Sequence, residues 1–187
     1  MAVPFKVVDV VVVGGGLAGV SAACTCAAAG LKTALIERRP VLGWEATWAY
    51  QLGFSGGQAA MTRSILQSCQ STGAWRVHRV DAPVLEMALN HEILRTGVLQ
   101  RNYWMPEQAG WVDRRLAALR CAGKSGRYEF QARAFIDATD NLDMWRMTGA
   151  ETQPVHGAAR AALFYNNLEE HSLGQPLAVS GAHNILL

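Results

Sequence analysis

The first 37 residues contain three short apolar segments that differ in composition. Residues 10–13 are four consecutive valines, and such a β-branched run is typical of a parallel strand that is buried on both faces. Residues 17–29 are rich in alanine and are followed by Gly30, which predicts a helix with a glycine just past its end. Residues 32–36 predict a second strand, so the chain opens with a strand–helix–strand unit.

The pattern beyond residue 37 predicts a longer α/β domain. Residues 38–79 are an insertion rich in glycine, serine, glutamine and tryptophan, and long insertions inside a domain are usually functional. Asp81 and Gly97 are suited to begin and end a helix between them, and alternating residues over 98–133 predict a β-meander. The expected elements are helices at 58–70 and 82–96 and strands at 98–105, 111–121, 127–132, 134–139 and 161–165.

The order of these elements indicates the fold class and the domains. We expect an α/β fold, Rossmann-like, with a parallel sheet and a meander. The apolar strand at 134–139 is expected to return the chain to the parallel sheet. We assign residues 1–150 to this domain, and residues 151–187 to the start of a region that contacts a substrate or a partner.

Composition and charge narrow the possible partners. Only 17% of the 187 residues are charged and six are tryptophan, against about 25% charged residues in a typical soluble domain. Part of the surface is therefore expected to be covered by a cofactor or another chain. A net charge of +2 without a basic run argues against a nucleic-acid partner. Asp9 interrupts the apolar opening, which is too short to span a membrane, so we expect a cytoplasmic protein.

The side chains suited to metal binding or catalysis form no recognisable set. Cys24, Cys26, Cys69 and Cys121 lack the spacing of metal ligands, and we interpret them as small apolar residues. The five histidines are scattered. The sequence therefore predicts no metal site and names no catalytic residue.

The strongest motif lies between the first strand and the first helix. Gly14, Gly16 and Gly19 have the spacing G-x-G-x-x-G, which allows a tight turn, close approach of a pyrophosphate and close packing of the helix on the strand. The N–H groups at the helix N-terminus then face the pyrophosphate. Glu37 ends the second strand, where an acidic side chain binds ribose hydroxyls and repels the 2′-phosphate of NADP. The sequence therefore predicts a dinucleotide site that disfavours NADP.

Several segments of residues 8–149 occur in a recognisable order. They are VDVVVVGGGLAGVSAA, ALIERRPVLG, DAPVLEMALNHEILRTGV, the meander, and FIDATDNLDMWRMTGAE. Together they resemble the FAD-dependent oxidoreductases of the glutathione-reductase-like type, and the last segment is similar to their I-D-A-T-G-D signature. The resemblance implies FAD as the cofactor, a flavoprotein oxidoreductase, and a small organic molecule as substrate.

The resemblance also implies which residues contact FAD. The residues at the pyrophosphate would be Gly14, Gly16, Leu17, Ala18, Gly19, Ala138 and Thr139. Those at the adenosine would be Glu37, on the ribose, with Arg38 and Met105 by the adenine. Those near the phosphates and the ribityl chain would be Gly43, Trp44 and Thr47.

The chain departs from the family pattern in two motifs and in length. Asp140 stands where the family has a glycine after Ala-Thr, and Trp44 replaces the second glycine of a Gly-Gly pair. The family's substrate domain and C-terminal flavin-binding segment are not visible in 187 residues, so we expect the fold to be incomplete without that segment. The chain is then a fragment, a split product completed by a second protein chain, or a shortened descendant, and its low charge favours a missing partner chain or missing sequence. A non-catalytic scaffold subunit and an NAD-binding domain stay open as alternatives, although the meander argues against the second.

Overall fold

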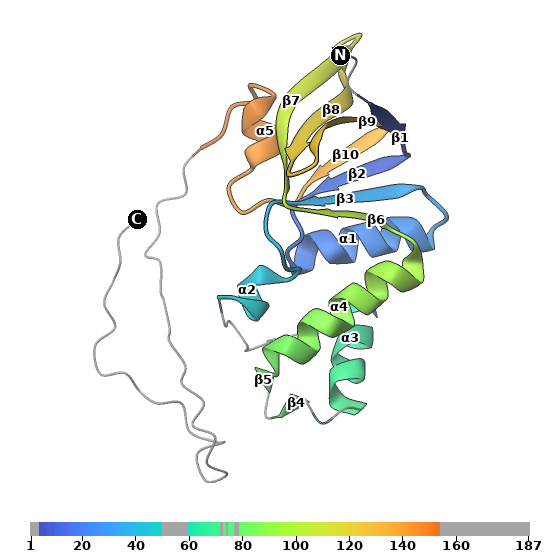
Figure 1. Cartoon of the computed structure of the whole chain (residues 1–187), viewed down its shortest axis with the longest axis vertical. Helices are drawn as coiled ribbons and strands as arrows, with labels where there is room; N and C mark the ends of the chain where they lie inside the picture. The colour runs from blue at the N-terminus through green and yellow to red at the C-terminus, as the bar shows by residue number, and fades with distance from the viewer. Residues whose placement is uncertain (1–3, 50–59, 72, 74, 77–78, 154–187) are drawn as a thin grey trace, which may run out of the picture.

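The molecule has three layers built around a parallel sheet (Figure 1). The computed structural model describes residues 4–49, 60–71, 73, 75–76 and 79–153. Helices cover one face of the parallel sheet, and an antiparallel sheet covers the other. The expected α/β fold with a parallel sheet and a meander is therefore confirmed.

The parallel sheet has the strand order β10-β2-β3-β6. Its strands are β10 (Ala134–Asp137), β2 (Val10–Val13), β3 (Thr33–Glu37) and β6 (Leu99–Asn102). All neighbours in this sheet run parallel. The prediction that the segment at 134–139 returns the chain to this sheet is confirmed, because β10 pairs directly with β2.

The four valines of β2 explain why this strand lies at the centre. All of them are buried. Val10 and Val12 pack into the apolar core on the helical side, whereas Val11 and Val13 pack into the core below the antiparallel sheet. Successive side chains of a strand point to opposite faces, so an uninterrupted valine run fills both cores at once.

The helical layer lies on one face of the parallel sheet (Figure 1). Its helices are α1 (Leu17–Ala28), α3 (Ala60–Ser71) and α4 (Ala82–Thr96), while the short helices α2 (Trp44–Thr47) and α5 (Asp143–Met147) lie in loops. The predicted caps of α4 are confirmed. Asp81 accepts a hydrogen bond from the Val84 N–H at 3.1 Å, and Gly97 ends the helix in the left-handed conformation.

The antiparallel sheet contains the predicted meander. It is formed by β7 (Trp104–Val112), β8 (Arg115–Gly123) and β9 (Gly126–Gln131), with β1 (Phe5–Val7) added parallel to β9. A separate hairpin joins β4 (Trp75–Arg76) to β5 (Arg79–Val80). Phe130 and Leu119 are fully buried between the two sheets, so the meander contributes to the second apolar core.

The prediction of one strand at 98–105 was wrong, and so was the position of the next strand. Tyr103 has a positive φ of 61° and breaks the segment into β6 and β7. As a result β6 joins the parallel sheet beside β3. The turn after β7 is formed by Asp113 and Arg114, both with positive φ, so Trp111 belongs to β7 and not to the following strand. Neither turn contains a glycine, which would have indicated a turn in the sequence.

The remaining elements were either missed by the sequence pattern, found with shifted ends, or lie outside the described residues. The sequence pattern did not predict β1 or α5. The predicted helix at 58–70 is present over the described residues as α3, which ends one residue later than expected. The strand expected at 161–165 and nearly all of the region at 151–187 lie outside the described residues.

Candidate cofactor site

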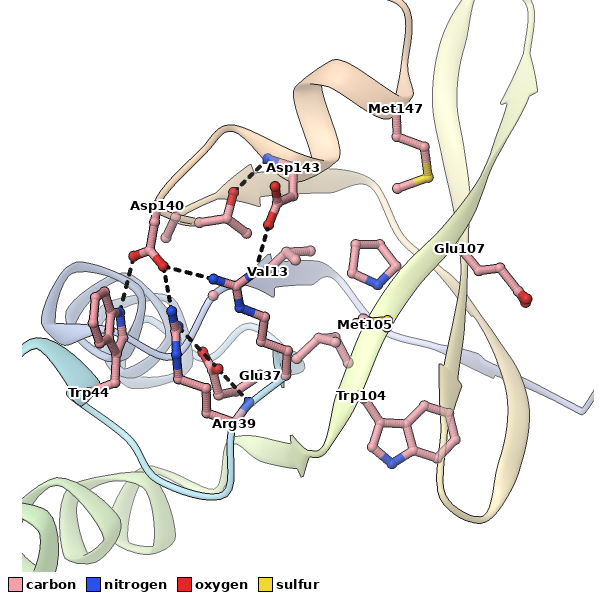
Figure 2. A pocket seen from close by; sticks show the side chains of 17 residues that line it. Val13, Glu37, Arg39, Trp44, Trp104, Met105, Glu107, Asp140, Asp143 and Met147 are labelled. Carbon is pink, nitrogen blue, oxygen red and sulfur yellow. Dashed lines mark hydrogen bonds and ion pairs between the residues drawn. The ribbon is translucent and has the colours of Figure 1, made fainter. Parts of the chain in front are cut away.

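A cavity of about 240 Å³ opens where the strands of the parallel sheet end (Figure 2). Ligands of open α/β sheets bind at these carboxyl ends. The structure brings eight of the predicted cofactor residues to the cavity wall: Gly14, Gly16, Glu37, Arg38, Trp44, Met105, Ala138 and Thr139. The ends of β2, β3 and β10 and the start of β7 therefore converge on one space.

The glycine turn packs too closely for side chains at two positions. Gly14 has a φ of +101°, and a Cβ there would lie 2.6 Å from the carbonyl carbon of Ala138. A Cβ on Gly19 would overlap the carbonyl oxygen of Gly14. Gly19 lies in the first turn of α1, so its missing side chain lets the helix N-terminus sit directly on the end of β2.

Glu37 lies in the cavity wall at the end of β3, with 1% of its surface exposed. One carboxylate oxygen accepts a hydrogen bond from the Gly15 N–H, and the other accepts one from the Arg39 N–H at 2.7 Å. The Arg39 guanidinium is also 3.6 Å from the second oxygen. A buried carboxylate needs such partners, and each oxygen keeps a further lone pair for a ribose hydroxyl.

Asp140, the departure from the family pattern, connects the loop after β10 to residues 38–44 at the cavity (Figure 2). Its carboxylate is 2.7 Å from Arg39 and 3.2 Å from Arg38, and it accepts a hydrogen bond from the Trp44 indole N–H at 3.0 Å. The Arg39 guanidinium in turn lies 4.0 Å from the centre of the Trp44 ring. The negative charge expected near a diphosphate is therefore paired with two cations.

Asp137 orders the loop that carries Thr139. Its carboxylate accepts hydrogen bonds from the Thr139 hydroxyl at 2.6 Å and N–H at 3.0 Å. It also accepts one from the Trp145 N–H at 2.8 Å. The Thr139 hydroxyl accepts a bond from the Asp143 N–H at 2.7 Å. These contacts hold α5 beside the cavity.

The other predicted residues lie next to the cavity rather than on its wall. Leu17 and Ala18 start α1 and present its N-terminus. Gly43 begins α2 in the left-handed conformation. Thr47 is buried, and its hydroxyl donates to the carbonyl oxygens of Leu42 and Gly43 at 3.0 Å. Thr47 therefore stabilises the loop through its hydroxyl.

The sequence analysis missed one acidic residue at the glycine turn. Glu45 accepts a hydrogen bond from the Leu17 N–H at 2.6 Å. A Cβ on Gly16 would lie 3.1 Å from both carboxylate oxygens of Glu45. The position of Glu45 could have revealed it, because an acidic residue is unusual in a loop that is expected to approach phosphates. Trp104, Glu107 and Met147, also on the cavity wall, gave no comparable signal.

One carboxyl on the cavity wall and three buried thiols have shifted pKa values. The hydrogen bond from Arg127 lowers the pKa of the Glu107 carboxyl. Burial raises the pKa values of the thiols of Cys24 and Cys69, and it raises the pKa of Cys121 to about 12. Cys26 is half-buried.

Within the described residues, no group of three or more His, Cys, Asp or Glu side chains is placed to hold a metal ion. In that same part of the chain, no helix has the length and apolar character needed to cross a membrane.

The sequence of residues 9–164 matches a family described as FAD dependent oxidoreductase. The chain belongs to this family. Family membership makes FAD the expected cofactor of the cavity. No curated protein is similar enough in sequence to count as a match.

Solved structures of similar fold support the architecture of this FAD dependent oxidoreductase domain. THI4 of Thermovibrio ammonificans matches with a TM-score of 0.57 and 21% identity, over 78% of this chain and 64% of that one. OxyS anhydrotetracycline hydroxylase from Streptomyces rimosus matches with a TM-score of 0.58 and 19% identity, over 81% and 36%. A geranylgeranyl bacteriochlorophyll reductase-like protein from Thermoplasma acidophilum matches with a TM-score of 0.58 and 16% identity, over 79% and 43%.

At these identities the likeness shows the fold alone. The chain spans less than two thirds of each of these structures.

The glycine turn of the cavity fits the diphosphate of FAD because it already binds an anion. The bare backbone of Gly16 and the Leu17 N–H already receive one anion, the Glu45 carboxylate. A helix N-terminus that accepts a carboxylate offers the same donors to a phosphate oxygen. Glu37 stands beside this turn, within reach of Gly15, as the ribose of a dinucleotide requires.

Proposed function

We propose that this chain is the FAD-binding portion of a flavin-dependent oxidoreductase that acts on a small organic substrate. Bound FAD would supply the redox chemistry by taking electrons from the substrate and passing them to an acceptor. The chain's own residues would bind and orient it. The glycine turn would hold the diphosphate, Glu37 the ribose, and Arg38 and Met105 the adenine.

The convergence of three strand ends carries the proposal. Gly14 follows β2, Glu37 ends β3 and Ala138 follows β10, and all of them line one cavity. The Ala138 N–H donates to the Val13 carbonyl at 2.7 Å, so the segment that resembles the second FAD motif lies beside the glycine turn. This proximity also supports the finer proposal of a glutathione-reductase-like type with a signature similar to I-D-A-T-G-D.

We further propose that more polypeptide, supplied by a second protein chain, completes the site. Large apolar side chains beside the cavity support this. Leu142, just before α5, is 43% exposed, and Trp145 on α5 is 50% exposed. Exposed apolar side chains that gather near a site often mark a surface that another molecule covers.

A specific observation favours a second candidate, a non-catalytic scaffold that keeps the fold without flavin. An internal carboxylate, Glu45, already occupies the N-terminus of α1. Asp140 adds a further acidic group where the family pattern has glycine, although Arg38 and Arg39 neutralise it.

The test is a titration of the purified full chain with FAD, and separately with NADH, followed by flavin fluorescence and the visible absorbance spectrum. Heat release then identifies the bound nucleotide. We expect close to one FAD per chain and no tight binding of NADH. Binding of NADH without FAD would replace the proposal with an NAD-binding domain, and binding of neither would favour the scaffold.

A further inference from the structure

The carboxylate of Glu45 lies against the backbone of the glycine turn. We propose that it occupies the position of the cofactor's diphosphate in the cofactor-free chain, and that it swings away when the cofactor binds. This inference rests on the proposed function, because it takes the glycine turn to be the place where a dinucleotide binds. Glu45 would then act as an internal competitor that sets the apparent affinity for the cofactor.

The position of the carboxylate is the first argument. Its Oε1 accepts the hydrogen bond of the Leu17 N–H, the first residue of α1, at 2.6 Å. Both oxygens lie 3.1 Å from the point that a Cβ on Gly16 would occupy. The carboxylate therefore lies flat against the bare backbone of the turn, at the helix end that carries the positive partial charge.

Competition for the same donor is the second argument. The first turn of α1 contains no acidic residue, and Gly16 offers no side chain to cap it. The Leu17 N–H has a single hydrogen to donate, and a diphosphate at the helix N-terminus needs such N–H groups. A carboxylate that stays within about 3 Å of a diphosphate would also repel it, since water screens charges less in a partly buried site.

The unpartnered second oxygen of Glu45 is the third argument. The second oxygen, Oε2, is buried without a hydrogen-bond partner. Across the described part of the chain no ion pair joins Glu45, and the two arginines on the cavity wall are engaged by Asp140 instead. A buried carboxylate oxygen without a partner is unfavourable, so rotation of Glu45 into water would restore hydration to that oxygen.

The surrounding loop allows the side chain to move alone. The Thr47 hydroxyl holds the carbonyls of Leu42 and Gly43, and the Trp44 indole holds Asp140. These bonds fix the backbone on both sides of Glu45. Release of the turn therefore requires a change of side-chain rotamer and no rearrangement of α2.

The test compares Glu45→Gln with the wild-type full chain, by isothermal titration with FAD. A matched control is Asp113→Asn, which removes the same charge from an exposed turn between β7 and β8. The apparent affinity scales with the fraction of the chain whose site is open. If the closed form outnumbers the open form about ten to one, Glu45→Gln lowers the dissociation constant about tenfold, and Asp113→Asn leaves it unchanged.

A second readout needs no cofactor. In the cofactor-free chain, the amide proton of Leu17 is expected to shift upfield in the ¹H–¹⁵N spectrum of Glu45→Gln, because a charged acceptor is replaced by a neutral one. Glu45→Ala, with its fold checked by circular dichroism, repeats both measurements if the glutamine variant does not fold.

The outcomes separate this inference from the proposed function. If wild type binds FAD, and Glu45→Gln binds it equally or more weakly, the carboxylate is not a competitor, while the proposed function stands. An unchanged Leu17 amide proton would overturn the inference as well. If neither protein binds FAD, both the inference and the proposed function are overturned.

Discussion

Replacement of Gly19 with alanine tests the packing of α1 on β2 by the addition of one methyl group. A Cβ at this position would overlap the carbonyl oxygen of Gly14, and it would lie 2.9 Å from the Gly14 carbonyl carbon and 3.3 Å from the Ala138 Cβ. Two of these atoms belong to the backbone, so they cannot rotate away as a long side chain would. The N-terminus of α1 must therefore move off the strand.

The expected change in the free energy of unfolding of Gly19→Ala follows from two opposing effects. Gly19 lies inside a helix, where alanine is favoured over glycine by about 1 kcal/mol. Overpacking of a close contact costs about 1–3 kcal/mol, and overlap with a backbone carbonyl belongs at the upper end of that range. We expect a net loss of about 1–2 kcal/mol in the free energy of unfolding. The displaced turn should also weaken FAD binding about tenfold, or about 1.4 kcal/mol.

Urea denaturation of the cofactor-free chain and FAD titration measure the two effects. Gly30→Ala is the matched control, because Gly30 follows α1 at its other end with a φ of +83°, and no atom lies within 4 Å of the point that a Cβ there would occupy. It should lose about 1–2 kcal/mol from the left-handed backbone and keep its affinity for FAD. A Gly19→Ala chain at least as stable as wild type would refute the packing argument. The gain in helix propensity would then outweigh the cost of the close contact.

Three further substitutions test the site and the core. Glu37→Ala removes the buried acceptor of the Gly15 and Arg39 N–H groups and should cost about 2–3 kcal/mol in urea denaturation; unchanged affinity for FAD would remove Glu37 from the cofactor site. Phe130→Ala, at a side chain with 0% exposure, should cost about 3–5 kcal/mol, and a loss below about 1 kcal/mol would contradict the packing of the two sheets. Burial raises the pKa of Cys121 from 9.0 to about 12, so its thiol stays protonated in the folded chain while it ionises in the unfolded one. Stability should therefore fall by about 1.4 kcal/mol per pH unit as the pH rises from 9 towards 12, and Cys121→Ala should show a shallower loss over this range.

Local patterns determined much of the fold. The valine run of β2 predicts a strand buried on both faces, and Val10 to Val13 are indeed shared between two cores. Asp81 and Gly97 mark the ends of α4 because each provides a cap that the adjacent backbone needs. The glycine spacing and Glu37 likewise pointed to residues that line the cavity, since both features lie at the ends of neighbouring strands.

The tertiary structure alone decided which side chains meet. Asp140 reaches Arg39 and Trp44 across 101 and 96 residues, and Glu45 reaches Leu17 across 28. Tyr103, with its positive φ, separates β6 from β7, and β6 pairs with β3 in the parallel sheet. A periodic pattern reports which face of an element is buried. It does not report the path of the chain between elements, and that path brings an internal carboxylate to the glycine turn.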